Sequence, residues 1–153
     1  MDLYLVQHGE ASPEAEDPTR PLTDRGRLEV ERVARAAGRA GLRVAHIGHS
    51  GKLRARETAY IFAAELQPSG GAVELAGLAP LDDPTVAARL VAEATEPTML
   101  VGHLPHLTRL ASLLLVGDPG REIVAFRMGA IACLGRAEDG WRVQWILTPE
   151  LVS

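Results

Sequence analysis

Three side chains in this sequence could together carry out phosphoryl transfer: His8, Arg54 and His103. A neutral imidazole is a good nucleophile near pH 7. A guanidinium can hold two oxygens of a transferring phosphoryl group, and a second, protonated imidazole supplies another charged donor. Because such a group carries its charge on its equatorial oxygens, catalysis depends mainly on positioning and electrostatic stabilisation. The three residues are far apart in the sequence, so this chemistry requires a fold that brings them together.

Each of the three residues comes after a short apolar run that is typical of a buried strand. Residues 3–6 precede His8, residues 44–48 precede the segment that contains Arg54, and residues 98–102 precede His103. Residues 73–75 indicate a further, weaker strand. The carboxyl ends of parallel strands meet at one edge of a sheet, where ligands bind in folds of this class. We therefore expect two imidazoles and one guanidinium at the same edge.

The segments between these strands have the periodicity of amphipathic helices. The four predicted helices start near Thr23, Gly51, Pro84 and Pro105. Thr23 is a candidate N-cap of the first helix, and Asp83 of the third. The residues predicted on inner helix faces include Val30, Val33, Ala34 and Ala37 in the first helix, Leu90 in the third and Leu104 in the fourth.

After Gly117 the pattern changes to strands, predicted over residues 122–127, 130–136 and 141–147, with a hairpin turn at 138–140. Trp141 and Trp145 alternate with polar neighbours, which predicts that both rings pack into the core from one strand face. The whole chain thus predicts one domain over residues 1–153. Its expected fold is a three-layer α/β/α sandwich with a mostly parallel sheet and antiparallel C-terminal strands.

Composition excludes several classes of partner. The net charge of −4 gives no indication of nucleic-acid or membrane binding, and no run approaches the roughly 20 apolar residues of a membrane helix. The single cysteine, Cys133, excludes an intramolecular disulfide and fits a reducing compartment. The first residues are too acidic for a signal peptide, so we expect a cytoplasmic protein. The sequence does not indicate an oligomeric state.

Four segments, in order, resemble motifs of the histidine phosphatase superfamily, which has a phosphoglycerate mutase-like fold. LYLVQHGE at residues 3–10 is similar to the nucleophile signature, and SGKLRARET at 50–58 to the Ser-x-x-x-Arg-Ala-x-x-Thr segment. VGHLP at 101–105 resembles the second-histidine segment, and RPLTDRG at 20–26 the segment before the first long helix. The short length and GAIA at 129–132 resemble the SixA-type phosphohistidine phosphatases of bacterial signalling.

This resemblance implies a role for each matching residue. His8 would accept the phosphoryl group as a transient phosphohistidine, which water then hydrolyses. Arg54 would bind phosphate oxygens, His103 would stabilise the transferring group, and Arg20 would be an auxiliary anion contact. No cofactor and no metal is expected: His46 and His49, like His103 and His106, are spaced by three, but no cysteine or carboxylate completes a ligand set.

The family's arginine before the nucleophile is Gln7 in this sequence, so Gln7 is the expected phosphate contact there. Glutamine can donate a hydrogen bond but carries no charge, and the loss of one charged donor costs roughly a hundredfold in rate. Lys52, Arg20 or Arg56 could replace the charge. Otherwise the protein would be a slow enzyme, or a weakly active module that binds phosphate or phosphohistidine.

The general acid is not fixed by the sequence. Glu10, Asp82 and Asp83 are candidates, although Asp83 is better explained as a helix cap, and His106 is a possible auxiliary near the pocket. A leaving imidazole needs less protonation than an alkoxide, which favours a phosphohistidine over a phosphate ester. We therefore expect a histidine-phosphorylated signalling or phosphotransfer protein as the substrate. The alternative is a small phosphate-containing metabolite, cleaved by a phosphomonoesterase of the same fold.

Overall fold

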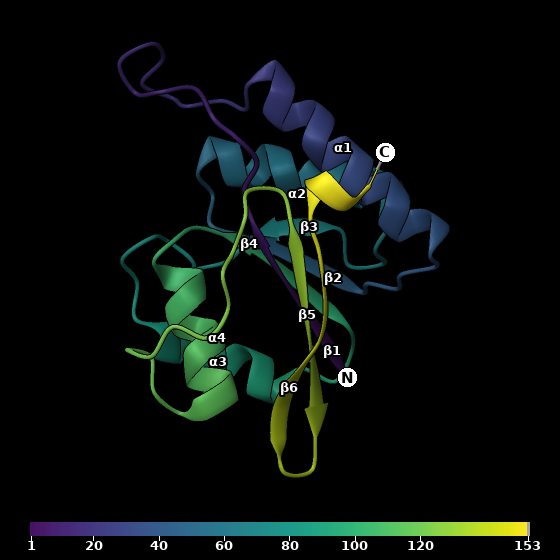
Figure 1. Ribbon diagram of the computed structural model, residues 1–153, viewed down its shortest axis with the longest axis vertical. Coiled ribbons are helices and arrows are strands. Elements are labelled where there is room, and N and C mark those ends of the chain that lie inside the picture. The colour runs from purple at the N-terminus through teal and green to yellow at the C-terminus, as the bar shows by residue number, and fades with distance from the viewer. Residues whose placement is uncertain (153) are drawn as a thin grey trace.

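The computed structural model describes residues 1–152, which form one six-stranded sheet in the order β3-β2-β4-β1-β5-β6 with helices on both faces (Figure 1). The strands are β1 (Asp2–Gln7), β2 (His46–His49), β3 (Ala72–Glu74), β4 (Thr98–Gly102), β5 (Ile131–Ala137) and β6 (Gly140–Leu147). The helices are α1 (Asp24–Arg39), α2 (Leu53–Leu66), α3 (Pro84–Glu93), α4 (His106–Val116) and the short 3₁₀ helix η1 (Pro149–Leu151).

The central strands β1 and β4 are parallel neighbours, in a register that pairs Leu5 with Leu100. β2 continues the parallel arrangement on the far side of β4, and β3 on the far side of β2. β5 is antiparallel to β1, and β6 to β5. The carboxyl ends of β1, β2 and β4 therefore meet at one edge, as the sequence predicts.

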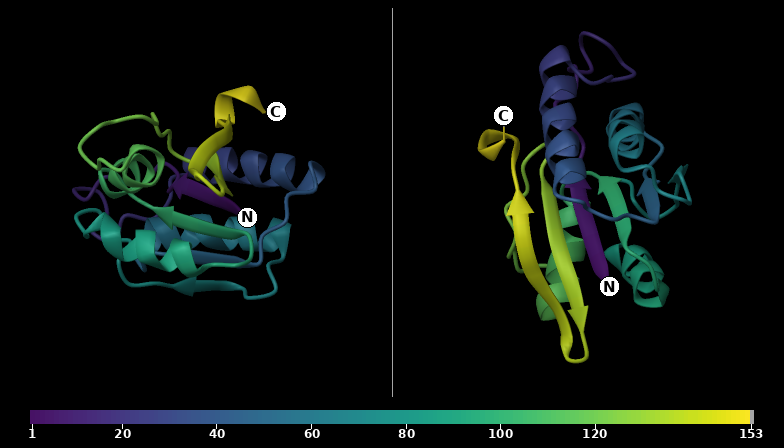
Figure 2. Two further views of the ribbon diagram at one scale, coloured as in Figure 1. Left: turned by 90° about the horizontal axis from the view of Figure 1, so that it is seen from below. Right: turned by 90° about the vertical axis from the view of Figure 1, so that its right-hand side faces the viewer.

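Two hydrophobic cores lie on opposite faces of the sheet (Figures 1 and 2). Along β1, Tyr4 and Val6 face the core formed with α1 and α2, whereas Leu3 and Leu5 face the core formed with α3 and α4. This alternation is the period-two pattern of a strand buried on both sides. The three-layer α/β/α arrangement is thus confirmed.

The start of α1 is held against the loop that follows β1. Thr23 is the N-cap, as predicted, and its hydroxyl accepts a hydrogen bond from Gly26 N at 2.9 Å. A Cβ at Gly26 would overlap the backbone carbonyl of Glu10, so only glycine allows this approach. By contrast, a Cβ at Gly38, near the end of the same helix, would make only ordinary contacts.

Three predictions about inward-facing segments are wrong. Residues 122–127 form no strand. Val124 is buried and Phe126 half-buried against the core beside α4, so these apolar side chains pack on the core from an irregular segment. Leu90 and Leu104 are 36% and 38% exposed, respectively. In α4, the inward positions are taken by Leu107, Leu110 and Ala111, which are fully buried.

The two tryptophans of β6 lie on opposite faces of the sheet rather than on one. A register shift between Cys133 and Leu134 pairs Cys133 with Trp145 but Leu134 with Val143, which reverses the alternation along β6. Trp145 contacts Tyr4, with ring centroids 6.1 Å apart, and is 38% exposed. Trp141 packs toward the α3–α4 core.

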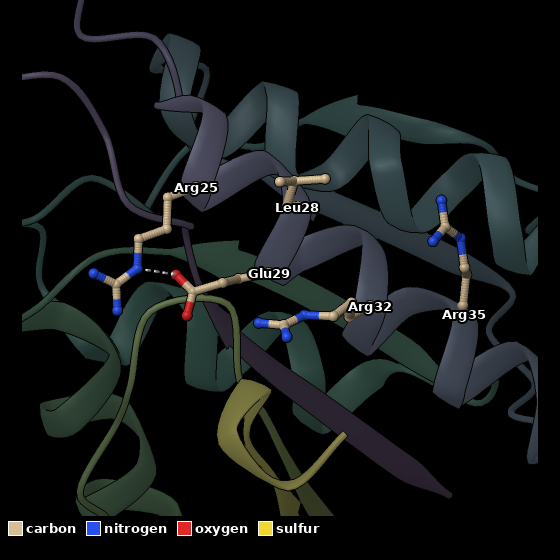
Figure 3. Close-up of a pocket in the computed structure, with 5 residues that line it drawn as sticks. All are labelled: Arg25, Leu28, Glu29, Arg32 and Arg35. Carbon is tan, nitrogen blue, oxygen red and sulfur yellow. Dashed lines mark ion pairs between the residues drawn. The ribbon is translucent and has the colours of Figure 1, made fainter. Parts of the chain in front are cut away.

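The outer face of α1 carries charged side chains. Figure 3 shows an ion pair between Arg25 and Glu29, 3.5 Å apart, with Arg32 and Arg35 farther along the helix. These residues line an open hollow of about 650 Å³. Among residues 1–152, no helix is long and apolar enough to span a membrane.

Candidate active site

His8 and His103 meet because they follow adjacent parallel strands. Gln7 at the end of β1 pairs with Gly102 at the end of β4, and His8 N donates to Gly102 O at 3.0 Å. The ring centroids of His8 and His103 are 5.1 Å apart, at an interplanar angle of 51°. The topology therefore brings the two predicted imidazoles together.

The ring of His8 is oriented by its own backbone. Nδ1 lies 2.7 Å from the carbonyl oxygen of Gly9, which can only accept, so Nδ1 carries the hydrogen and Nε2 keeps a lone pair in the neutral ring. Burial lowers the pKa of His8 to about 4, against the opposing effect of the Gly9 bond, and the charges of Arg54 and Arg20 lower it further. At pH 7 the imidazole is therefore neutral.

His103 is fixed by Ser50. Its Nε2 lies 2.6 Å from Ser50 Oγ, and only 2% of the residue is exposed. Burial lowers the pKa of His103 to about 3, and the neighbouring His8 and Arg54 lower it further, because a second positive charge beside them is unfavourable. The protonated second histidine expected from the sequence is thus neutral in this structure. Ser50 is the first residue of the SGKLRARET segment, but the sequence by itself predicts no role for it.

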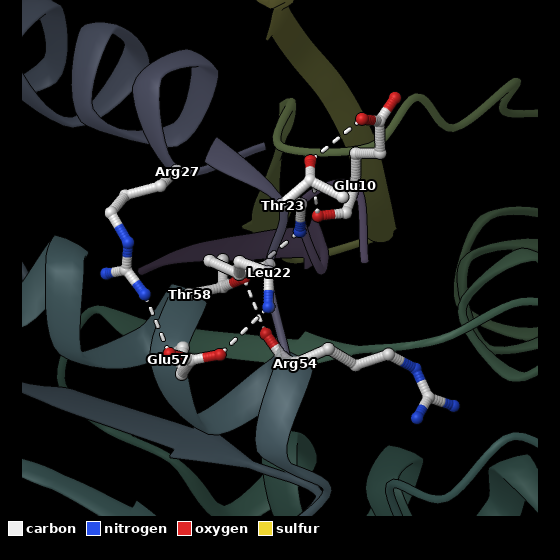
Figure 4. A network of polar contacts seen from close by, with 8 residues as sticks. Glu10, Leu22, Thr23, Arg27, Arg54, Glu57 and Thr58 are labelled. Carbon is white, nitrogen blue, oxygen red and sulfur yellow. Dashed lines mark hydrogen bonds and ion pairs between the residues drawn. The ribbon is translucent and has the colours of Figure 1, made fainter. Parts of the chain in front are cut away.

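Arg54 is on the first turn of α2, directly after β2. Burial and the charge of Arg20 lower its pKa. Figure 4 shows its guanidinium extending away from Glu57, which instead binds Arg27 at 2.7 Å and accepts a hydrogen bond from Leu22 N at 2.9 Å. Nε of Arg54 is buried and has no hydrogen-bond partner among residues 1–152. The guanidinium is therefore not committed to a carboxylate within that range.

Two of the three residues considered as replacements for the missing positive charge lie near the histidines. The charge of Arg20 lowers the pKa of both His8 and Arg54, and that of Lys52 lowers the pKa of His103. Nε of Arg20 donates a hydrogen bond to Ser12 O at 3.1 Å. The backbone of Arg20 has a φ of 49°, a left-handed conformation that is uncommon outside glycine. Arg56 instead influences His49.

Gln7 and Glu10 line a hollow of about 360 Å³ together with Leu104 and Met128, and His8, Arg54 and His103 are not among its lining residues. The carboxylate of Glu10 accepts a hydrogen bond from the Thr23 hydroxyl at 2.8 Å. Glu10 is therefore held at the start of α1, at the edge of the site. Leu104 and Met128 are 38% and 43% exposed, so this hollow has an accessible apolar side.

The other residues considered as acids or auxiliaries have structural contacts. His106 is completely buried at the start of α4, and burial lowers its pKa, so it lies under the site rather than in an accessible pocket. Asp83 caps α3 as expected, accepting from Thr85 N at 2.9 Å. Asp82 accepts from Ala79 N at 3.0 Å. Within the described range of 1–152, no group of three or more potential ligands could hold a metal ion.

Comparison with known proteins agrees with this geometry. The model of the histidine phosphatase superfamily (branch 1) matches residues 3–79. An uncharacterized protein of Picosynechococcus sp. is 35% identical over 139 residues, which cover 86% of this chain and 83% of that protein.

Solved structures extend the likeness to the whole fold. The protein histidine phosphatase SixA complexed with tungstate is 25% identical, with a TM-score of 0.86 over 99% of both chains. The α-ribazole phosphatase of Shigella flexneri shares the fold at 13% identity, with a TM-score of 0.76 over 97% of both chains. The chain therefore belongs to the histidine phosphatase superfamily, and it is a phosphatase with a histidine nucleophile.

Proposed function

We propose that His8 is the nucleophile of this phosphatase and that a phosphohistidine on a protein is its substrate. One observation carries the proposal: His8 is neutral, its Nδ1 is bound to Gly9 O, and its Nε2 is left to react beside His103. A phosphotransfer protein with such a group would place the enzyme in signalling.

In the first step, Nε2 of His8 attacks phosphorus while the bond to the leaving imidazole nitrogen of the substrate breaks. That nitrogen takes up a proton from solvent water, and the phosphoryl group is now bonded to Nε2 of His8. In the second step, water attacks phosphorus, inorganic phosphate leaves and Nε2 regains its lone pair. Arg54 binds the phosphoryl oxygens throughout, because guanidinium N–H groups match their geometry.

The remaining positive charge comes from Arg20 and Lys52. The charge of Arg20 lowers the pKa values of His8 and Arg54, and that of Lys52 lowers the pKa of His103, which supports this assignment. Gln7 contributes a neutral donor in place of an arginine. A bound phosphoryl dianion raises the pKa of His103, because an opposite charge favours the protonated ring. His103 then becomes a charged donor only when substrate is present.

The substrate class follows from the leaving group. Glu10, which lines the hollow together with Gln7, is already bound to Thr23, and Asp82 and Asp83 accept hydrogen bonds from backbone N–H groups elsewhere. A leaving imidazole nitrogen is protonated more easily than an alkoxide, so this site suits a phosphohistidine better than an ester. The likeness to the protein histidine phosphatase SixA supports the same choice.

The test compares wild type, His8→Ala and Gln7→Arg on a histidine-phosphorylated phosphotransfer protein and on a sugar phosphate. We expect wild type to dephosphorylate the protein faster and to carry radiolabelled phosphate on His8. His8→Ala should abolish turnover and labelling, whereas Gln7→Arg should keep or raise turnover. Undiminished turnover by His8→Ala would refute the nucleophile, and faster hydrolysis of the sugar phosphate would refute the substrate preference.

A further inference from the structure

A buried hydroxyl connects the nucleophile loop to the helix that carries Arg54. Thr58 is completely buried in α2. Its Oγ accepts a hydrogen bond from Gly9 N at 3.0 Å and donates one to the carbonyl of Arg54 at 2.7 Å (Figure 4). Because Gly9 O also accepts from Nδ1 of His8, three consecutive hydrogen bonds run from the His8 ring to the Arg54 backbone.

The chemistry of the groups fixes the direction of each bond. A backbone N–H can only donate and a carbonyl can only accept, so the Thr58 hydroxyl must accept from Gly9 and turn its own hydrogen to Arg54. The bond to Arg54 spans one helical turn, which is a common local arrangement for threonine. The bond from Gly9 joins the loop after β1 to α2, so local helix geometry does not account for it.

Gly9 is also held from its other side. A Cβ at Gly9 would lie 2.7 Å from Cγ2 of Val30, so its backbone packs directly on α1. Gly9 thus sits between α1 and α2, with its N–H bound to Thr58 and its carbonyl bound to the nucleophile. A shift of Gly9 would move the His8 ring relative to Arg54.

Building on the proposed function, we propose that Thr58 is a positioning residue that sets the His8 ring relative to the phosphate-binding Arg54. Thr58 itself does not touch the substrate. It acts through Gly9, and its contribution is to the alignment of Nε2 with a phosphoryl group held by Arg54. Misplacement of a reacting atom by about 1 Å costs on the order of a hundredfold in rate.

The test uses Thr58→Val, which nearly keeps the shape but removes the hydroxyl, and Thr58→Ser, which restores it. We expect Thr58→Val to lower kcat about tenfold to a hundredfold with little change in KM, because alignment changes more than binding does. Thr58→Ser should stay within about threefold of wild type on the same reasoning. The matched control is Thr98→Val, which removes another buried hydroxyl, bound to Glu96 O at 2.9 Å at the opposite end of β4.

A second readout separates positioning from general loss of stability. NMR observes the ring N–H proton of His8, which is protected from exchange while Nδ1 is bound to Gly9. We expect this proton in wild type, Thr58→Ser and Thr98→Val, and its loss or fast exchange in folded Thr58→Val. This measurement needs no turnover. It therefore tests whether Thr58 positions the His8 ring even if His8 is not labelled by phosphate and the proposed function is wrong.

Any of three results would overturn the inference. The first is a folded Thr58→Val protein with wild-type kcat and a protected His8 proton. The second is a Thr58→Ser protein as impaired as Thr58→Val, which would show that shape rather than the hydroxyl is needed. A fall in kcat in Thr98→Val equal to that in Thr58→Val would likewise assign the effect to stability.

Discussion

At His8, burial and function favour the same protonation state. Burial is the main cause of the low pKa of about 4, and the charges of Arg54 and Arg20 lower the pKa further. The ring therefore stays neutral at pH values well below the usual pKa of histidine. A neutral ring is needed for nucleophilic attack. Consequently we expect the residue to be reactive over a wider range of acidic pH than an exposed histidine would be.

This predicts a low midpoint for His8 in a pH titration. We expect its imidazole to protonate near pH 4, followed by NMR and assigned by comparison with His8→Ala. Because the unfolded chain binds the proton at about pH 6.5 and the folded chain does not, the free energy of unfolding should also fall as pH decreases from about 6.5 to about 4. A midpoint at or above 6.5 would contradict the buried, neutral ring.

Sequence alone could predict which residues meet, but not how charge is arranged around them. His8, Arg54 and His103 were expected together because each follows a strand of one parallel sheet, and the geometry of such sheets is general. The neutrality of His103 depends on its burial, and the position of the Arg20 charge depends on a left-handed backbone and a bond to Ser12. The spacing of residues in a sequence does not show how deeply a side chain is buried or in which direction it points.

Among the elements, the start of α1 shows how tightly the nucleophile loop is packed. The third residue of this helix is Gly26, whose Cα lies against the backbone of Glu10, so any side chain there must push the loop away. Since the loop also contains His8 and Gly9, a change in α1 is transmitted to the site.

A pair of glycine substitutions in α1 tests this packing. We expect Gly26→Ala to destabilise the fold by about 1–3 kcal/mol, despite the better helix propensity of alanine, because the added Cβ overlaps the Glu10 carbonyl. Gly38→Ala, whose Cβ would be 3.7 Å from the Glu65 carboxylate, should stabilise it by roughly 0.5–1 kcal/mol. Urea unfolding measures both, and equal effects of the two changes would be inconsistent with a close approach at Gly26.

The elements that sequence predicts well are those with long periodic patterns. In α1, Val30, Val33, Ala34 and Ala37 are buried as expected from helical spacing. The misread elements had short or ambiguous patterns. Val124 and Phe126 alternate like strand residues, but an irregular segment that covers a core presents the same alternation. The bulge inserts one extra residue in β6, and no residue type in that strand predicts a bulge there.

Across the whole molecule, Arg136 joins the β5–β6 hairpin to the end of α3. Its guanidinium donates to the carbonyls of Val91 and Ala92, each at 3.0 Å, and of Ala94 at 2.7 Å. The guanidinium carbon also lies 5.5 Å from the centre of the Trp141 ring. These carbonyls lie at the end of a helix, where a fixed cation is favourable, and that of Val91 also accepts from Ala94 N at 3.3 Å.

Replacement of this guanidinium should affect stability more than replacement of a surface one. We expect Arg136→Lys to lower the free energy of unfolding by about 1–3 kcal/mol, since an ammonium cannot reach three carbonyls in fork geometry. Arg142→Lys, which alters an exposed pair with Asp139 on the same hairpin, should change it by less than about 0.5 kcal/mol. The comparison is made by urea unfolding; a loss at Arg142 as large as that at Arg136 would contradict the bridging role.

The central place of β1 has a consequence for synthesis of the chain. Leu3 pairs with Thr98 on one side, and Tyr4 pairs with Cys133 on the other, so both neighbours of β1 are translated long after it. At about 5–20 residues per second, the first strand waits on the order of 10 s for its partners. Until then its backbone edges are open, and the nascent polypeptide has no competent reaction centre. A ribosome-bound fragment that stops before β5 would thus be inert, and it would offer an unpaired apolar strand to chaperones.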